Sequence, residues 1–376
     1  MKLTFNKIFF YIFSLLWSGL IICNLVTPAK AFSENENRFL AELPKYTNEK
    51  LINGEYMNGL DEYVNDQFVF RDNWIGLKTM AERVLLKRDI NSVYFAKDGY
   101  LIEKHNKSDV SEEQAEKNKD RLTEFVERYV EKLGEDRVNV MLVPTASEIL
   151  KDKLPLFSTG YDQEAYLKEV IESLPEGTFI DVRDILNQHK NEYIYYRTDH
   201  HWTALGAYYA YEKWAKDAGF TPLSREQFDI TLGSDKFYGT LHSKVNVNVK
   251  PDDIYLYEIK EDMNYHLLYN LTDETNTLYD LSKLEGKDKY SVYMGGNNAL
   301  VEVQTNNKNG RRLLVIKDSY AHSFVPLAVN HYEDTFMIDF RYFNGGVEEF
   351  IEENGITDVL VPVSYTHLTL PTTPYV

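Results

Sequence analysis

The sequence predicts an α/β protein built on a doubly wound parallel sheet, and two observations lead to this prediction. From residue 106 to residue 363, short apolar runs alternate with amphipathic helical segments, which is typical of parallel strands covered by helices on both faces. In addition, 43% of the 376 residues are apolar, which is enough for a large buried core. Right-handed crossovers would place a functional site at the carboxyl ends of the strands.

Composition and charge exclude several classes of function. The net charge is −18, and removing residues 1–31 takes away three lysines and no acid, which brings the charge to −21. Nucleic acid is therefore not an expected partner. The only cysteine, Cys23, lies inside the N-terminal apolar run, so a mature domain would have neither thiol chemistry nor a cysteine-ligated zinc ion. We expect no cofactor.

Residues 1–31 are predicted to be a signal peptide or a membrane anchor. Lys2 and Lys7 precede an uncharged run over residues 8–26, and Ala29-Lys30-Ala31 follows as a small-x-small site. The run is longer than an ordinary signal core and just long enough to span a bilayer. Cleavage and retention both stay open, and we expect the rest of the chain to be extracytoplasmic, either secreted or anchored by residues 8–26.

Residues 32–105 are predicted to form an N-terminal arm, helices and a hairpin. Residues 33–60 are polar and are expected to be extended. Residues 58–87 have a helical pattern with an apolar face, which predicts a packing layer. That face contains Tyr63, Phe68, Phe70, Trp74, Leu77 and Met80. Residues 92–102, with Asp98-Gly99 at their centre, predict the hairpin.

Residues 106–363 are predicted to form the main α/β domain. Helices are expected at 111–132, 163–173, 204–215, 320–330 and 347–354, and strands at 138–143, 178–182, 313–316, 335–340 and 358–363. Residues 220–310 contain Asn-rich and alternating Tyr/Ile stretches, which predict a mainly β insertion. Residues 364–376 change composition abruptly and resemble translated adapter sequence, so we expect a non-native tail.

A loop with an acid and two imidazoles is the first candidate for chemistry. Residues 196–206 are Tyr-Arg-Thr-Asp-His-His-Trp-Thr-Ala-Leu-Gly. Thr203 is a good helix N-cap, so Asp199, His200 and His201 are expected on the loop before the helix. On an extended segment, residues i and i+2 point to the same side. We therefore expect Asp199 to orient His201 as a base, while His200 points away.

Ser319 is the candidate nucleophile that such a base requires. It follows the apolar run 313–316 and precedes a predicted helix, so its hydroxyl is expected at the carboxyl edge of the sheet. Backbone N–H groups at that helix start, beginning with Tyr320, are natural oxyanion donors. Asn297, in the stretch Tyr293-Met-Gly-Gly-Asn-Asn, is a second candidate donor, although Gly-Gly-Asn is more commonly an ordinary turn.

Three segments together carry a resemblance to a known family. They are Asp-His-His-Trp at 199–202, Lys-Asp-Ser-Tyr-Ala at 317–321 and Ile-Asp-Phe-Arg-Tyr-Phe at 338–343. These segments resemble the bacterial DHHW family, which is similar to the SGNH-like domains of alginate O-acetyltransferases. The resemblance covers residues 35–363, and Lys317 departs from the wider group, where a glycine often precedes Asp-Ser.

The resemblance implies an SGNH hydrolase-like fold and a Ser-His-Asp triad. Ser319 would be the nucleophile, His201 the base and Asp199 the orienting acid. Trp202 and Arg341 become candidates for substrate contacts. The implied partners are an acyl donor, a polysaccharide acceptor and a membrane-bound acyltransferase that supplies acyl groups.

Three hypotheses about function stay open at this point, and one alternative concerns the site. The hypotheses are a polysaccharide O-acetyltransferase, a carbohydrate acetylesterase of the same fold and a non-catalytic glycan-binding surface protein. The alternative is a metal hydrolase, because two adjacent histidines and an aspartate are good ligands. Phosphoesterases of the DHH type need further aspartate motifs that we do not find in this sequence, so we expect no metal.

Overall fold

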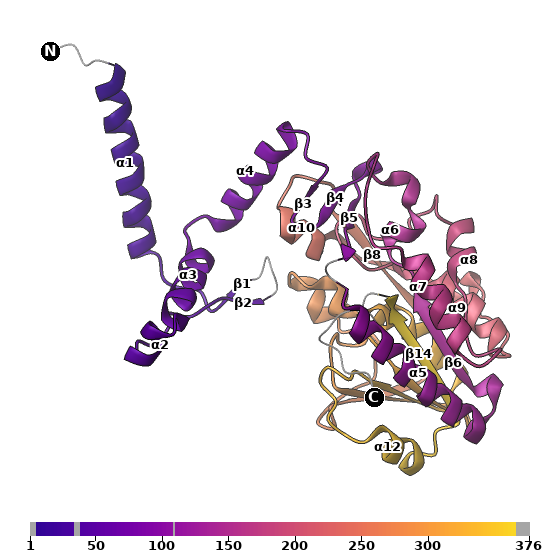
Figure 1. The fold of residues 1–376 in the computed structure, drawn as a ribbon. Coiled ribbons are helices and arrows are strands. Elements are labelled where there is room, and N and C mark those ends of the chain that lie inside the picture. The colour runs from indigo at the N-terminus through magenta and orange to yellow at the C-terminus, as the bar shows by residue number, and fades with distance from the viewer. Residues whose placement is uncertain (1–4, 34–37, 108–109, 366–376) are drawn as a thin grey trace. The chain divides into compact units, whose positions relative to one another are not determined.

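The computed structural model describes residues 5–33, 38–107 and 110–365 (Figure 1). The chain divides into a smaller unit of residues 1–87 and 243–248 and a larger unit of residues 88–242 and 249–376. The expected hairpin belongs to the larger unit, where β4 (Val93–Phe95) pairs with β5 (Leu101–Glu103) and a short additional strand, β3 (Asp89–Ile90), pairs with β4.

The larger unit is built on a seven-stranded mixed sheet. Its strands are β6 (Val138–Val143), β9 (Tyr265–Tyr269), β10 (Asp273–Thr275), β11 (Leu300–Thr305), β12 (Arg312–Ile316), β13 (Asp334–Ile338) and β14 (Asp358–Ser364). In the order β10-β9-β11-β13-β12-β14-β6, the last four strands are parallel and the first three are antiparallel to their neighbours. The prediction of a parallel sheet is therefore correct for one half and wrong for the other.

The antiparallel half of the sheet comes from the segment that was expected to be an insertion. Strands β9, β10 and β11 all lie within residues 220–310 and extend the main sheet. Two other strands of this segment, β7 (Phe228–Phe237) and β8 (Asp252–Ile259), form a separate antiparallel pair. The segment is mainly β as predicted, but part of it belongs to the central sheet.

The strand expected at residues 178–182 is reduced to an isolated parallel bridge. Phe179 pairs with Val140 at the outer edge of β6. The Val140 N–H donates to the Thr178 carbonyl and the Ile180 N–H donates to the Val140 carbonyl, each at 2.8 Å. A pair of hydrogen bonds around one residue does not extend the ladder, which corrects the prediction of a fifth parallel strand.

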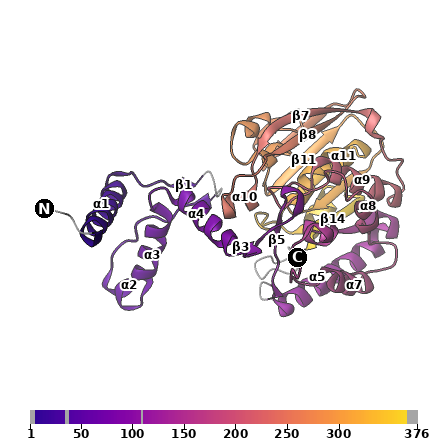
Figure 2. The ribbon, with the colours of Figure 1, turned by 90° about the horizontal axis from the view of Figure 1, so that it is seen from above.

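Apolar side chains alternate along the parallel strands and enter two cores on opposite faces of the sheet. In β12, Leu313 and Val315 belong to one core and Leu314 and Ile316 to the other. The first core is covered by α6 (Ala146–Ile149), α8 (Arg183–Gln188), α9 (Ala204–Asp217) and α11 (Val325–Ala328), and the second by α5 (Glu112–Leu133), α7 (Gln163–Ser173) and α12 (Val347–Glu353). Figure 2 shows α9 and α11 on one side of the sheet and α5 and α7 on the other.

Four of the five predicted helices of this domain lie where they were expected, and the fifth is broken. Residues 319–331 form a 3₁₀ helix, Ser319–Ser323, followed by the short α11 and a second 3₁₀ helix, Val329–His331. Pro326 lies at the start of α11. Because proline has no N–H, it begins a new turn and does not continue the preceding one.

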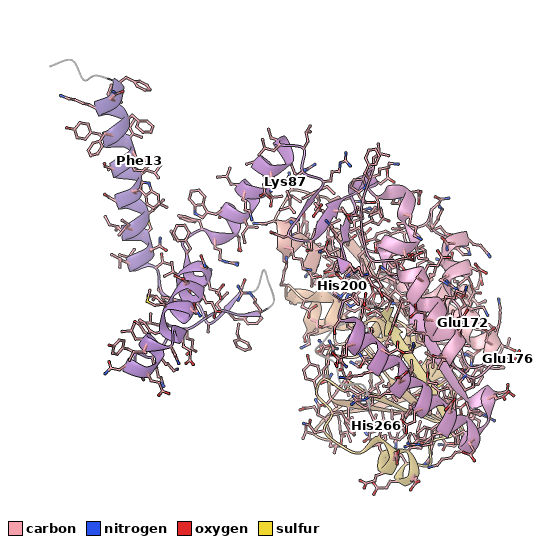
Figure 3. All side chains as sticks on the ribbon, viewed as in Figure 1. Phe13, Lys87, Glu172, Glu176, His200 and His266 are labelled. Atoms are coloured by element: carbon pink, nitrogen blue, oxygen red, sulfur yellow. The ribbon has the colours of Figure 1, made fainter. Side chains whose placement is uncertain are left out.

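The smaller unit contains α1 (Phe5–Val26), α2 (Asn48–Ile52), α3 (Glu55–Gln67), α4 (Arg71–Val84) and a short pair of strands, β1 (Phe32–Ser33) and β2 (Arg38–Phe39). Among the described residues, α1 is the one helix long and apolar enough to cross a membrane. None of its side chains is buried, including the labelled Phe13 (Figure 3). Residues 48–60, expected to be extended, are largely helical, and the helix expected at 58–87 is split at Phe70, which has a φ of 58°.

The boundary expected for the C-terminal tail lies too early. Ser364 is the last residue of β14, and its N–H donates to the Asp318 carboxylate. Tyr365 is fully buried beside Tyr166. Residues 364 and 365 therefore belong to the packed domain, whereas residues 366–376 lie outside the described part of the chain.

Residues 194–203 form a closed loop immediately before α9. The Thr203 N–H donates to the Ile194 carbonyl at 3.0 Å, and the Tyr196 N–H donates to the His201 carbonyl at 3.2 Å. The Thr203 hydroxyl caps α9 by accepting a hydrogen bond from the Gly206 N–H. The segment is thus a compact turn at a capped helix start, and it is not extended as predicted.

Gly206→Ala is predicted to lower the melting temperature. A Cβ at this position would lie 2.3 Å from the Ile194 carbonyl oxygen, and overpacking of this kind costs about 1–3 kcal/mol. Alanine is otherwise favoured over glycine inside a helix by about 1 kcal/mol, so without the clash the substitution would stabilise the protein. Thermal unfolding measures the difference. The control is Gly286→Ala, where the nearest atom to a Cβ lies at 3.7 Å, and an unchanged or raised melting temperature for Gly206→Ala would contradict the closed loop.

Candidate active site

The ends of the four parallel strands bring polar residues to one edge of the sheet. Ser319 follows β12, Asp339 follows β13 and Thr145 follows β6, while Ser364 ends β14. Because parallel strands all end at the same edge, residues from distant parts of the chain meet here. The expected location of the site at this edge follows directly from the parallel half of the sheet.

Ser319, His201 and Asp199 form a hydrogen-bonded chain. Ser319 Oγ lies 2.7 Å from His201 Nε2, and His201 Nδ1 lies 2.6 Å from Asp199 Oδ1. Ser319 is partly exposed, whereas Asp199 is 3% exposed. In the structure the imidazole lies between a serine hydroxyl and a carboxylate, which is the geometry expected from the sequence.

The Asp199 carboxylate is buried among donors. Besides the His201 ring, it accepts hydrogen bonds from the His201 N–H at 3.0 Å, the Thr240 N–H at 2.8 Å and the Thr240 hydroxyl at 3.1 Å. Burial alone would raise the pKa of Asp199, but His200, His201 and these hydrogen bonds hold it well below its usual range. The carboxyl group is therefore ionised and able to stabilise a positive charge on His201.

A glycine allows the backbone to approach Asp199 this closely. A Cβ on Gly239 would lie 2.2 Å from Asp199 Cβ and 2.3 Å from its Oδ2. Only a residue without a side chain fits, and it places the Thr240 N–H against the carboxylate. Residues 239 and 240 lie within the segment 220–310, which was predicted only to be a mainly β insertion, so the sequence analysis missed their part in the site.

A second buried carboxylate, Asp252, holds the start of the same loop. It accepts hydrogen bonds from the Arg197 N–H at 2.8 Å and the Thr198 N–H at 2.7 Å, and also from the hydroxyls of Thr198 and Tyr193. The Thr198 hydroxyl in turn accepts from the Gly239 N–H at 3.0 Å. Asp252 thus joins the loop that carries the acid and base to the segment that supplies Thr240.

His200 lies closer to the triad than predicted. Its ring centroid is 3.9 Å from that of His201, its Nδ1 is 3.6 Å from Asp199 Oδ1, and the same nitrogen is 2.8 Å from the Thr240 hydroxyl. The prediction that it points away assumed an extended backbone, and the compact turn brings both rings to the same carboxylate. Only His201 is paired with Ser319 in the structure.

Two groups that were expected to face a substrate are instead hydrogen-bonded within the protein, at the turn that carries Ser319. The Tyr320 N–H, predicted as an oxyanion donor, donates to Asp318 Oδ1 at 2.8 Å. Trp202, predicted to contact substrate, is fully buried and donates from its indole N–H to the Tyr320 carbonyl at 3.0 Å. Trp202 therefore fastens the histidine loop to the nucleophile turn and does not line a binding surface.

Tyr290 contacts both the base and the nucleophile, and no sequence pattern distinguishes it from the other tyrosines among the 28 of the chain. Its ring is stacked on the His201 imidazole with centroids 4.0 Å apart and planes 10° apart. Its hydroxyl donates to the Ser319 carbonyl at 3.1 Å. Burial raises the pKa of Tyr290 well above its usual value, so the phenol stays neutral and orients both base and nucleophile.

Lys317, the position at which the chain departs from the pattern that the resemblance implies, is buried next to the nucleophile turn. Its Nζ lies 3.0 Å from Asp339 Oδ2 and 2.8 Å from His322 Nε2. Burial lowers the pKa of Lys317, and the Asp339 carboxylate opposes that change. Arg341 pairs with Asp339 through two hydrogen bonds of 2.8 and 2.6 Å, and it also contacts Asn297 Oδ1 at 3.3 Å. The two candidate residues Arg341 and Asn297 thus meet each other at an ion-pair network.

Asp199, His200 and His201 also satisfy the spacing of a metal site, since their potential ligand atoms lie within 4.8 Å of one another. However, His201 Nδ1 faces Asp199 and its Nε2 faces Ser319. A metal ion bound to His201 would have to break one of these two hydrogen bonds. The geometry favours the Ser-His-Asp arrangement.

Comparisons with solved structures place this fold among known relatives. A DHHW family protein from Eubacterium siraeum DSM 15702 has 28% sequence identity and a TM-score of 0.61, over 75% of this chain and 93% of that chain. Bacillus cereus PatB1 with a sulfonyl adduct has 19% identity and a TM-score of 0.63, over 74% and 97%. The O-acetyltransferase domain of Pseudomonas putida AlgJ has 13% identity and a TM-score of 0.44, over 76% and 94%.

Comparison with models of sequence families shows which family the chain belongs to. No curated protein sequence matches it significantly. The family described as DHHW protein matches residues 118–338, a region that contains both the Asp-His-His-Trp loop and the Ser319 turn. Because this match spans more than half of the chain, the protein belongs to the DHHW family.

Proposed function

We propose that this protein is an extracytoplasmic acyltransferase that moves an acetyl group onto a polysaccharide through Ser319, His201 and Asp199. The observation that carries the proposal is the continuous hydrogen-bonded chain, with 2.7 Å between Ser319 Oγ and His201 Nε2 and 2.6 Å between His201 Nδ1 and Asp199 Oδ1. A partly exposed serine beside a base that is itself fixed by a buried carboxylate is an arrangement suited to covalent catalysis.

The first step forms an acyl-enzyme. Ser319 Oγ attacks the carbonyl carbon of an acyl ester while His201 Nε2 accepts the hydroxyl proton, and Asp199 stabilises the resulting imidazolium. The tetrahedral intermediate then collapses, the bond to the donor alcohol breaks, and His201 returns the proton to that leaving alcohol. The acetyl group is left on Ser319, and the base is neutral again.

The second step transfers the acyl group. A sugar hydroxyl attacks the acyl-serine while His201 accepts its proton, and the proton passes to Ser319 Oγ as the serine ester breaks. Water in place of the sugar would give an acetylesterase with the same residues. The balance between the two reactions depends on how well the acceptor excludes water from the acyl-enzyme.

The cellular setting is part of the proposal. An α1 that is retained as an anchor would hold the domain at the outer face of the membrane, and a cleaved signal would release it. In either case the acyl group has to reach Ser319 outside the cytoplasm. A membrane-bound acyltransferase that passes acyl groups outward is the partner that fits this requirement.

Incubation with an aryl acetate is predicted to add one acetyl group to Ser319. Intact mass spectrometry followed by peptide mapping measures the adduct and its position. A sulfonyl fluoride is a useful second probe, since Bacillus cereus PatB1 is known with a sulfonyl adduct. Ser319→Ala should remove both adducts. An adduct that maps elsewhere, or that persists in Ser319→Ala, would overturn the assignment of the nucleophile.

Substitutions of the triad residues and of His200 are predicted to lower turnover of the aryl acetate to different extents. His201→Ala should cost as much as Ser319→Ala, because triad members act as a unit. Asp199→Asn should cost somewhat less, and the equivalent change in serine proteases lowers kcat by about 10⁴-fold. His200→Ala should cost far less than His201→Ala, since the His200 ring is bonded to Thr240 and not to Ser319.

The matched control for this series is His266→Ala, an exposed histidine on β9 (Figure 3). It should leave turnover unchanged. Melting temperatures of all variants are compared first, so that a lost activity is not mistaken for a lost fold. Equal losses at His200 and His201, both reversed by added zinc, would favour a metal site and refute the triad.

A further inference from the structure

We propose that the acceptor binds in a cleft beside the triad and that it is a neutral glycan, not a polyanionic one. This inference rests on the proposed function and adds the place and the charge class of the second substrate. The cleft lies in the larger unit, and its lining residues come from β5, α6 and the loop that leads to α7. Its volume is about 320 Å³, which is large enough for a few sugar units in an open groove.

The cleft shares part of its lining with a small cavity beside the triad. A second cavity, of about 10 Å³, shares Glu103, His105 and Ser147 with the lining of the main cleft and is also lined by His200 and Tyr320. Tyr320 directly follows the nucleophile, and the His200 ring lies 3.9 Å from the ring of the base. A space of this size admits about one water-sized group, so a single hydroxyl group that enters it would lie beside His200 and Tyr320, the neighbours of the base and the nucleophile.

The topology of the sheet explains why the cleft and the nucleophile are neighbours. Ser147 follows β6 and Ser319 follows β12, and both strands run parallel to β14, which lies between them. Their carboxyl ends must therefore open on the same edge of the sheet. A cleft at this edge can hold a long substrate while one hydroxyl reaches Ser319.

The floor of the cleft offers both donors and acceptors. Gln163, which is 2% exposed, donates to the hydroxyls of Thr145 at 2.8 Å and Ser147 at 3.0 Å. The two hydroxyls are themselves 2.8 Å apart. A hydrogen-bonded cluster of amide and hydroxyl groups can exchange partners with a ligand that also donates and accepts, which is the chemistry of a sugar hydroxyl.

The walls of the cleft are held in place by contacts across it. The Tyr161 N–H donates to the His105 carbonyl at 2.9 Å, and the Tyr94 hydroxyl donates to the Thr159 carbonyl. These bonds connect β4 and the segment after β5 to the loop that precedes α7. A cleft with fixed walls loses little entropy when it binds, which suits a flexible oligosaccharide.

The charges around the cleft argue against a polyanionic acceptor. Two lysines line it, and each is paired, Lys151 with Glu148 at 2.5 Å and Lys104 with Asp89 at 3.1 Å. Glu103 and Asp162 add further negative charge to the lining. The net charge of −18 would repel a polyuronate. Both lysines that line the cleft are already paired with carboxylates, so they offer little compensating attraction.

The test starts from acetyl-Ser319 enzyme prepared with an aryl acetate and freed of excess reagent. The neutral acceptors are cellopentaose, xylopentaose and a pentamer of N-acetylglucosamine, and oligogalacturonate is the anionic comparison. Mass spectrometry follows loss of the acetyl group from the enzyme and its appearance on the sugar. At least one neutral sugar should accelerate deacylation with transfer, whereas oligogalacturonate should leave the rate at that of water.

Ser147→Trp is predicted to fill the small cavity that Ser147 lines together with His200 and Tyr320. Transfer to the neutral sugar should fall by about 10-fold or more, while the acetyl adduct on Ser319 still forms and persists. Ser282→Trp, an exposed serine outside the cleft, is the matched control and should transfer like the wild type. If Ser147→Trp does not fold, Thr159→Trp, at the exposed mouth of the cleft, is the second blocking variant.

The outcomes separate this inference from the proposed function. If the wild type forms no adduct on Ser319, the proposed function fails and the inference fails with it. If the adduct forms but no neutral sugar accepts it, or oligogalacturonate accepts it equally well, the inference alone is overturned. Transfer at the wild-type rate by a folded blocking variant would equally show that the acceptor binds elsewhere.

Discussion

The structure of the site depends on one buried charge, the Asp199 carboxylate. Removing an ionised group from water costs several kcal/mol unless hydrogen bonds replace the lost solvation. Here the donors come from two segments, His201 on one side and Thr240 on the other, and Gly239 permits the approach. The need to satisfy this carboxylate therefore fixes the shape of the loop and, through it, the position of the imidazole.

The nucleophile is fixed independently, by the parallel half of the sheet. Asp318 accepts hydrogen bonds from the N–H groups of Tyr320 and Ser364, so the turn is tied to the end of the neighbouring strand. Trp202 and Tyr290 then connect this turn to the histidine loop. Two rigid parts joined in this way hold the reacting groups in place before a substrate arrives, which is the arrangement that efficient catalysis requires.

Local signals in the sequence predicted most helices and the three central site residues. Thr203 marked a helix start, and Ser319 followed an apolar strand, so both could be placed without knowing the fold. The antiparallel strands within residues 220–310 could not be assigned to the main sheet, because strand pairing depends on partners far away in the sequence. The contact of Tyr290 with His201 and the turn that brings His200 near Asp199 likewise arise only from tertiary structure.

The central claim is that an ionised Asp199 holds the Nδ1–H of His201, which leaves Nε2 to accept the proton of Ser319. Proton NMR of the folded protein measures this bond directly, because a proton shared between imidazole and a buried carboxylate resonates far downfield of the amide region. We expect such a resonance in the wild type and in Ser319→Ala, and its loss in His201→Ala and Asp199→Asn. Its absence from the wild type, or its persistence in Asp199→Asn, would show that Asp199 does not hold the Nδ1–H of His201.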